Sequence, residues 1–403
     1  MEGCLAVGQL RRKTQHTTMV SKRRKRQADG AADRAGESMM AVDAMLGALL
    51  DWYRSHQRQL PWRATTDPYA IWVSEIMLQQ TQVATVLRYF ERFLQRFPTI
   101  EALAKADLSE VHRLWEGLGY YRRATQMHEA AKRIEQEHGG RFPERWDEVR
   151  QLPGIGRYTA SAILSFAWDQ PYSILEANTQ RLYARCIAWE EPLAKAGSQK
   201  VLWQFADRLV VAQGMGQINH ALMDLGAMVC TPRNPDCRGC PIARWCSAHR
   251  LGKVDRIPAA KPPKVYTELE EWVVLVVDRR GRWLVRRCGE GERWAGLFDF
   301  PRFDLTGLES AEEQHQAIAE QASKILGRGL VPLEPVGGLR HAVTRYRIEL
   351  SVWTGRALAG RWRSSADLLW VAPEALAKLP FSSSGRKIAK WISEGKVEGH
   401  KLR

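Results

Sequence analysis

The chain has 403 residues, of which 45% are hydrophobic, so it can bury the cores of two or three domains. Its 60 Lys and Arg exceed its 45 Asp and Glu, and the resulting net charge of +15 indicates a polyanionic partner. No apolar run approaches the roughly 20 residues that cross a bilayer, which argues against a membrane protein and favours nucleic acid as that partner.

Residues 1–38 carry two basic runs, Arg11–Lys13 and Lys22–Arg26, and no apolar segment. We predict a basic disordered tail here, able to tether the chain to DNA without sequence preference. An over-extended reading frame, with Met39 or Met40 as the first residue, is an open alternative. The lack of an apolar segment argues against a signal peptide.

Residues 39–250 are predicted to form an all-α domain. Strand-type alternation is weak there, and Pro and Gly separate stretches in which apolar residues recur at helical spacing. These stretches are Met45–Trp52, Ile71–Leu94, Val111–Ile134, Ala160–Phe166 and Ala221–Val229.

Glu75 interrupts the apolar run Ile71–Leu78. If it is buried, desolvation raises the pKa of its carboxyl and keeps it available as a general acid near neutral pH. If the helix is amphipathic, Glu75 instead lies exposed on its polar face.

The segment Gln151–Arg157, QLPGIGR, has the form of a helix-hairpin-helix turn. Gly154 and Gly156 allow a sharp turn and a close approach to a surface. Backbone N–H groups at the start of the following helix can then bind a phosphate. Any tight interhelical turn could use this pattern, so it indicates a helix-hairpin-helix motif only because a cysteine cluster follows it in the chain.

That cluster, C-x6-C-x2-C-x5-C, comprises Cys230, Cys237, Cys240 and Cys246. Four cysteines this close together predict one metal centre, and the spacing alone leaves iron–sulfur and zinc both open. Clustered thiols with scattered single cysteines are typical of a reducing cytoplasm. Three arginines between or beside these cysteines suit phosphate binding: Arg233, Arg238 and Arg244.

Several segments together resemble the MutY-type adenine DNA glycosylases of the helix-hairpin-helix superfamily, almost continuously from Leu60 to Cys246. They are Leu60–Arg63 (LPWR), Ser74–Val83 (SEIMLQQTQV), Gly117–Tyr121 (GLGYY), Leu152–Ala160 (LPGIGRYTA), Met223–Cys230 (MDLGAMVC) and the cysteine loop. The resemblance implies a base-excision repair hydrolase that carries a [4Fe–4S] cluster at 230–246. It also implies a monomer that acts on double-stranded DNA with A:8-oxoguanine or A:G mispairs in a bacterial cytoplasm, at the nucleoid. A clamp or mismatch-repair partner is left open.

The resemblance also assigns roles by position. Glu75 matches the acid that protonates adenine N7. Matches to residues that line the base pocket are Tyr158, Asn178 and Arg63, and matches to residues that wedge into the base stack are Gln80 and Tyr120.

Tyr158 separates this chain from the endonuclease III branch, which carries a lysine at that position. A lysine can form a Schiff base and support strand cleavage, whereas a tyrosine cannot. We therefore expect a monofunctional glycosylase. The mismatch thymine glycosylases, which resemble this domain and can carry tyrosine there, are the alternative.

Glu176 departs from the family pattern. The family motif L-D-G-N has an aspartate that stabilises or attacks the oxocarbenium-like sugar, and this chain has Leu175-Glu176-Ala177-Asn178 instead. The added methylene can misplace the carboxylate, which costs rate. A catalytically weakened lesion-binding protein is therefore a further alternative, although we expect Glu176 to perform the role of the family aspartate.

Residues 251–267 have a linker composition, and residues 268–403 change pattern to α+β. A hairpin is predicted from Trp272–Val277 and Trp283–Arg287, which flank a D-R-R-G turn. A helix is predicted over Ala311–Leu326 and a half-buried strand over Arg345–Trp353.

The segment Trp294–Pro301, WAGLFDFP, resembles part of the Nudix-like lesion-recognition domain of the same family. The family's lesion-reading loop, F-S-H, aligns with Val343-Thr344-Arg345. We expect Thr344 to hydrogen-bond 8-oxoguanine and Arg345 to contact its phosphate, with a solvent-facing Arg345 as the alternative. Residues 296–326 contain no R-E-x-x-E-E run for Mg²⁺, so diphosphate hydrolysis is not expected.

Overall fold

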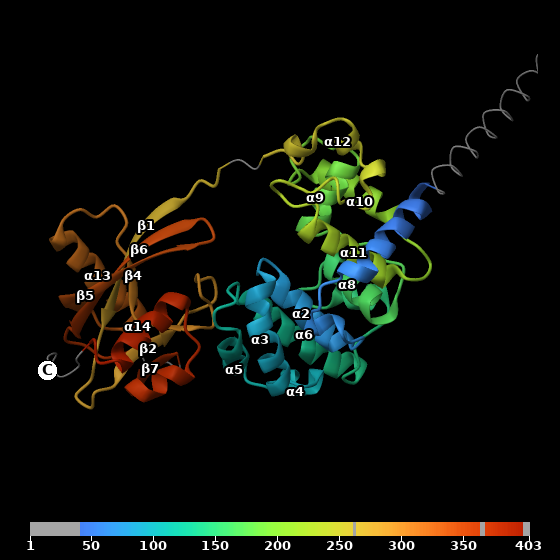
Figure 1. The fold of residues 1–403 in the computed structure, drawn as a ribbon. Coiled ribbons are helices and arrows are strands. Elements are labelled where there is room, and N and C mark those ends of the chain that lie inside the picture. The colour runs from blue at the N-terminus through green and yellow to red at the C-terminus, as the bar shows by residue number, and fades with distance from the viewer. Residues whose placement is uncertain (1–40, 261–262, 363–366, 398–403) are drawn as a thin grey trace, which may run out of the picture. The chain divides into compact units, whose positions relative to one another are not determined.

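The computed structural model of the protein describes residues 41–260, 263–362 and 367–397, and the predicted tail over 1–38 lies outside them. The chain divides into two compact units, and the division falls within helix α8 (Arg157–Trp168). Of the described residues, one unit comprises 41–66 and 160–260 (Figure 1). The other comprises 67–159 and the part after 262. No helix within the described ranges is long and apolar enough to cross a membrane.

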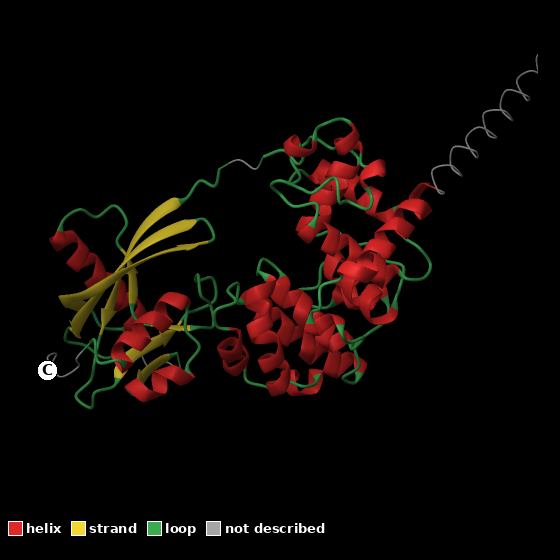
Figure 2. Ribbon diagram, in the orientation of Figure 1, coloured by secondary structure: helices red, strands yellow, loops and turns green. Residues whose placement is uncertain are grey.

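The first unit is helical and surrounds one hydrophobic core (Figure 2). Leu49, Tyr183 and Leu225 are almost completely buried in this core, from three different helices. Besides a helix over 41–56, the elements are η1 (Pro61–Arg63), α9 (Ala177–Cys186), α10 (Ala196–Asp207), α11 (Met215–Met228), η2 (Ala243–Trp245), α12 (Ser247–Arg250) and η3 (Val254–Arg256).

The second unit begins with six helices. Asp67 caps the first of them, since its side chain accepts hydrogen bonds from the N–H groups of Tyr69 and Ala70, and Pro68 occupies the first helical position. The helices are α2 (Pro68–Leu78), α3 (Val83–Arg96), α4 (Ile100–Ala104), α5 (Leu108–Trp115), α6 (Arg122–His138) and α7 (Trp146–Gln151).

The rest of the second unit contains two sheets. A four-stranded sheet has the order β4-β1-β6-β5, in which β1 pairs parallel with β6, and a three-stranded sheet has the order β3-β2-β7. Two hydrophobic clusters fill this region, one with α13 and one with α14. The elements are β1 (Thr267–Leu275), β2 (Trp283–Arg287), β3 (Phe298–Asp299), β4 (Arg302–Asp304), α13 (Ala311–Leu326), β5 (Leu330–Val343), β6 (Tyr346–Ala357), β7 (Leu368–Val371), η4 (Pro373–Lys378) and α14 (Ser383–Ser393).

Two of the predicted helical stretches are broken in the structure. Ile71–Leu94 is divided between α2 and α3, and Val111–Ile134 between α5 and α6. Each break contains a non-glycine residue in the left-handed region, Gln80 at φ +57 and Tyr120 at φ +48. Apolar residues recur at helical spacing on both sides of each break, and the predicted stretches therefore ran across the polar residues 79–82 and across Gly117 and Gly119.

The C-terminal expectations are confirmed in outline. Helix α13 has the predicted bounds, and a capping box between Ser310 and Glu313 begins it. The predicted turn at 278–281 forms, with an isolated bridge between Val277 and Trp283. Beyond that bridge, β1 and β2 diverge into different sheets instead of continuing as a hairpin.

Candidate active site and nucleic-acid interface

Glu75 lies in α2 and is only 3% exposed. The Tyr158 hydroxyl, from the first turn of α8, donates a 2.7 Å hydrogen bond to Glu75 Oε2. The exposed alternative is wrong because every residue of α2 from Tyr69 to Met77 is buried, so this helix has no polar face there. A carboxyl in apolar surroundings, fixed by a phenol hydroxyl, is suited to general-acid chemistry.

The hairpin between α7 and α8 has the predicted glycine geometry at one of its two glycines. Gly154 has φ +77, and a Cβ there would lie 2.9 Å from the Cβ of Gln126. Gly156 has no positive φ, and its nearest neighbour is Arg150, 3.9 Å from a Cβ placed there. Arg150 also donates a 2.8 Å hydrogen bond to the Ile155 carbonyl, which fixes the turn. Only Gly154 therefore needs to be glycine for conformational reasons.

Both residues that the resemblance assigns as wedges lie in the helix breaks. Gln80 is exposed in the α2–α3 break, and Tyr120 is 48% exposed in the α5–α6 break. Positive φ at a non-glycine residue is strained and persists only where the surroundings hold it. An exposed side chain on a strained and fixed backbone is suited to insertion into a base stack.

Arg123, a buried residue of α6, holds both breaks in place. Its NH1 group donates to the carbonyls of Ile76, Met77 and Gln79 at 2.7, 2.9 and 2.6 Å. Its NH2 group donates to the carbonyls of Leu118 and Gly119, at 3.1 and 3.0 Å, and to the Thr81 hydroxyl. Burial lowers the pKa of Arg123 to about 10, so the guanidinium remains charged near neutral pH.

The Arg123 guanidinium supplies hydrogen-bond donors to carbonyls at the end of α2. The last carbonyls of a helix have no partner within it, and they carry the negative end of the helix dipole. A cation from α6 satisfies them and at the same time binds the loop that carries Tyr120. Sequence reasoning missed this residue because an arginine in an amphipathic helix usually faces solvent.

Glu176 caps the start of α9. Its Oε1 accepts from the Thr179 N–H at 2.9 Å, and its Oε2 accepts from the Asn178 N–H at 2.8 Å and from Asn178 Nδ2 at 3.3 Å. Burial raises the pKa of the Glu176 carboxyl above its ordinary value, against the opposing effect of these N–H groups and of Arg181. The longer side chain thus folds back onto the helix N-terminus, where a negative charge is favoured.

Arg181 connects this cap to the cysteine loop. Its NH2 group donates to Asn178 Oδ1 at 3.1 Å and to the Gly226 carbonyl at 2.5 Å, and its Nε donates to the Cys230 carbonyl at 2.7 Å. Gly226 allows this approach, because a Cβ there would lie 2.8 Å from the Asn178 Cβ. The backbone at Cys230 therefore helps to fix the amide of Asn178.

Arg63, expected at the base pocket, forms an ion pair. Its NH1 and NH2 groups lie 2.6 and 2.8 Å from the two carboxylate oxygens of Asp224, which is completely buried. Arg58 donates to the same carboxylate through its backbone N–H and its Nε. Burial raises the pKa of Asp224, but the hydrogen bonds and charges of Arg63 and Arg58 outweigh it and hold the pKa below its ordinary value. A DNA contact by Arg63 stays a prediction.

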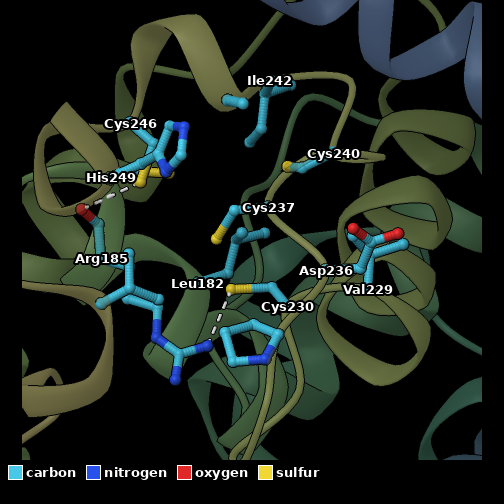
Figure 3. Close-up of a pocket in the computed structure, with 14 residues that line it drawn as sticks. Leu182, Arg185, Val229, Cys230, Asp236, Cys237, Cys240, Ile242, Cys246 and His249 are labelled. Atoms are coloured by element: carbon cyan, nitrogen blue, oxygen red, sulfur yellow. Dashed lines mark hydrogen bonds between the residues drawn. The ribbon is translucent and has the colours of Figure 1, made fainter. Parts of the chain in front are cut away.

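The four clustered cysteines line a single pocket in the first unit (Figure 3). Cys230 follows the end of α11 by two residues, and Cys246 directly precedes α12. Arg185 NH1 donates to the Cys230 sulfur at 3.3 Å, an interaction that suits a thiolate. Within the described ranges, however, no group of three or more His, Cys, Asp or Glu side chains is arranged to hold a metal ion.

A large cavity lies within the second unit. Its volume is about 1150 Å³, and Tyr120 and Thr344 both line it. The structure therefore brings together two residues that are more than 220 positions apart in the sequence, and to which the resemblance assigns a wedge role and a lesion-reading role. Basic side chains in the lining are Arg122, Arg287, Arg293, Arg340 and Lys387, and acidic ones are Glu290, Glu292 and Asp367.

Thr344 and Arg345 form the two-residue loop between β5 and β6. Thr344 is exposed at φ +54, as this kind of tight turn requires. Arg345 lies in the turn and not on a strand, and it donates to the Tyr346 hydroxyl at 2.9 Å. His341, which sequence reasoning left without a role, lines the same cavity, and its ring centroid lies 6.4 Å from that of Trp294.

Comparison with known proteins agrees with a helical part followed along the chain by an α+β part. The model of the HhH-GPD superfamily of base excision DNA repair proteins matches residues 73–206, and that of the NUDIX domain matches residues 272–391. These matches confirm the predicted fold class, a helix-hairpin-helix domain followed by a Nudix-like α+β domain.

Curated relatives match over most of the chain. An adenine DNA glycosylase of Buchnera aphidicola is 37% identical over 66% of this chain and 76% of its own length. One from Rattus norvegicus is 32% identical over 88% of this chain and 78% of its own length. One from Homo sapiens is 41% identical over 74% of this chain and 56% of its own length.

Proposed function

The chain belongs to the adenine DNA glycosylases of the base-excision repair superfamily, and on this premise we propose how and on which mispairs it acts. It is a DNA-binding hydrolase that removes adenine. Its substrate is adenine opposite 8-oxoguanine or guanine in double-stranded DNA. It hydrolyses the N-glycosidic bond and leaves the strand uncut.

The buried pair of Glu75 and Tyr158 carries this proposal. Adenine departs readily only if its ring is protonated, and Glu75 is the acid that delivers the proton to N7. Tyr158 fixes the carboxyl through the 2.7 Å hydrogen bond to Oε2. Tyr158 has no amine for a Schiff base, which supports base removal without strand cleavage. Relatives named for adenine, not thymine, support a purine substrate.

Glu176 stabilises the sugar cation that forms as the base departs. Its carboxylate is held by the N–H groups of Asn178 and Thr179, so little rearrangement is needed when positive charge develops nearby. Asn178 is held in turn by Arg181. This support compensates for the extra methylene relative to the aspartate of the family motif.

Base flipping relies on the two helix breaks. An adenine inside the duplex cannot reach a buried carboxyl, so it must leave the stack, and a side chain must fill the gap. Gln80 and Tyr120 are exposed on fixed loops and fill it. Thr344, on the lining of the same cavity as Tyr120, contacts the base opposite the adenine, and Arg345 contacts its phosphate.

The four cysteines hold a [4Fe–4S] cluster. Four soft thiol donors converge on one largely apolar pocket, and Arg185 offsets negative charge at Cys230. A cluster takes one thiolate for each of its four irons, so it does not require the close convergence that a single ion does. When bound, the cluster ties the loop 230–246 together and presents its arginines to phosphates.

We also propose a bacterial cytoplasmic enzyme that works as a monomer at the nucleoid, where its mispaired substrate occurs. The test is a single-turnover reaction on a duplex with one adenine opposite 8-oxoguanine, followed by alkali to cleave abasic sites. We expect alkali-dependent cleavage at that adenine, lost in Glu75→Gln and retained in Glu91→Gln, an exposed residue of α3. Tight binding with intact DNA would instead indicate a lesion-binding protein, and cleavage without alkali would refute the monofunctional mechanism.

A further inference from the structure

We propose that Glu116 and Arg386 form a latch that fixes the Tyr120 loop to the lesion-reading domain and thereby sets the preference for 8-oxoguanine over guanine opposite adenine. Glu116 directly precedes the GLGYY segment, and Arg386 lies in α14, 270 residues further along the chain. The inference rests on the proposed function, because it concerns how the same site distinguishes its two mispairs.

The latch is a bidentate, half-buried ion pair. Arg386 Nε donates to Glu116 Oε1 at 2.5 Å, and NH2 donates to Oε2 at 2.9 Å. The side chains are 28% and 16% exposed, so solvent screens them only in part. Arg386 also donates to the carbonyls of Leu376 and Leu379, which fix the guanidinium before Glu116 binds it. A planar guanidinium held in this way fixes both the orientation and the distance of the Glu116 carboxylate.

The Tyr120 loop has little freedom on the Glu116 side. The Tyr89 hydroxyl donates a 2.9 Å hydrogen bond to the Glu116 carbonyl. Gly117 follows with φ +100, and a Cβ there would lie 2.2 Å from that hydroxyl. At the other end of the loop, the Tyr121 hydroxyl donates to the Phe381 carbonyl at 3.2 Å. The loop that carries the wedge is thus tied to the lesion-reading domain on both sides of Tyr120.

The lesion-reading loop is connected to Arg386 through packed structure. Ile388 and Ala389 of α14 lie in the same hydrophobic cluster as Leu339 and Val343 of β5, the strand that ends at Thr344. The first residues of α14, Ser383 and Ser384, and Lys387 line the cavity directly. A displacement of α14 relative to Glu116 therefore changes the position of Thr344 relative to Tyr120.

Discrimination depends on this relative position. Contacts that Thr344 makes with 8-oxoguanine, and not with guanine, raise the excision rate only if Tyr120 engages the same base pair at the same time. Small misplacements of such groups lower reaction rates strongly. Loosening the latch therefore lowers the excision rate for A:8-oxoguanine. The rate for A:G, which lacks those contacts, falls less. Glu116 and Arg386 are positioning residues that touch neither base.

The experiment measures single-turnover excision of adenine opposite 8-oxoguanine and opposite guanine. The variants are Glu116→Gln, Arg386→Met and the double variant that carries both substitutions. We expect each single variant to lower the ratio of the two rates about 10-fold and the double variant to lower it no further, because both substitutions remove the same ion pair. Glu110→Gln is the matched control, because it breaks a bidentate pair with Arg96 of the same geometry between α3 and α5. It is expected to leave the ratio unchanged.

The outcomes separate the latch from the function on which it rests. If the unaltered protein excises adenine from neither mispair, the proposed function fails, and if it excises adenine from both at the same rate, only the latch fails. If it shows the preference and the single variants keep it, only the latch is refuted, even where their melting temperature falls. A ratio that falls equally in Glu110→Gln, or losses that multiply to about 100-fold in the double variant, also refute the latch.

Discussion

Replacing Arg123 with methionine is expected to destabilise the protein and to disable both wedges at once. Methionine has a similar length and fits an apolar site, but it donates no hydrogen bond. The carbonyls of Ile76, Met77 and Leu118 accept from Arg123 as buried groups, whereas its other three acceptors are partly buried and can find water.

The magnitude follows from the three buried carbonyls. A buried polar group left without a partner costs about 1–3 kcal/mol. Three such groups give at least about 3 kcal/mol, and because neighbouring losses are not additive we expect a loss of about 3–5 kcal/mol in the free energy of unfolding. The free energy of unfolding of Arg123→Lys is expected to lie between those of the unaltered protein and Arg123→Met, since an ammonium group has three donors for six acceptors.

The assay combines urea unfolding with single-turnover excision at a temperature where every variant remains folded. Arg133→Met is the control, because Arg133 lies on the same helix, its side chain is 36% exposed, and it donates hydrogen bonds to Glu137 and to the Gln151 carbonyl. We expect a cost of at most about 1 kcal/mol and an unchanged rate from this control. If Arg123→Met costs no more than Arg133→Met, or if it is destabilised but excises adenine at the full rate, then Arg123 does not organise the wedges.

Three further predictions concern single residues. Glu176→Gln should lower the excision rate about 100-fold or more, while Glu176→Asp keeps it within about 10-fold, and a fast Glu176→Gln enzyme would remove Glu176 from the mechanism. Burial lowers the pKa of His112 to about 4, so only the unfolded chain takes up this proton between pH 6.5 and 4. Stability should therefore fall on acidification by about 1.4 kcal/mol per pH unit from this group, and melting curves of His112→Gln should show a shallower slope. Cys237→Ser should lower the iron and sulfide bound per chain, and full retention of both would contradict a four-cysteine cluster.

The sequence determined the features that depend on local patterns. The change from helical spacing to alternation located the helical and α+β parts, and the β6 strand and helix α13 formed where their patterns predicted. The buried position of Glu75 agreed with the apolar run around it. The four clustered cysteines line one pocket, and the metal centre that their spacing predicts stays a prediction.

The tertiary structure decided the features that depend on contacts between distant residues. Apolar periodicity on both sides of the breaks at 79–82 and 116–121 did not show where the helices end. Gln80 and Tyr120 have positive φ in these breaks, and Arg123 binds both loops from another helix. No pattern in the sequence indicated that Asp224, 161 residues away, binds the guanidinium of Arg63. A charged side chain pairs with whichever opposite charge the fold brings near it, and no local pattern in a single sequence contains that information.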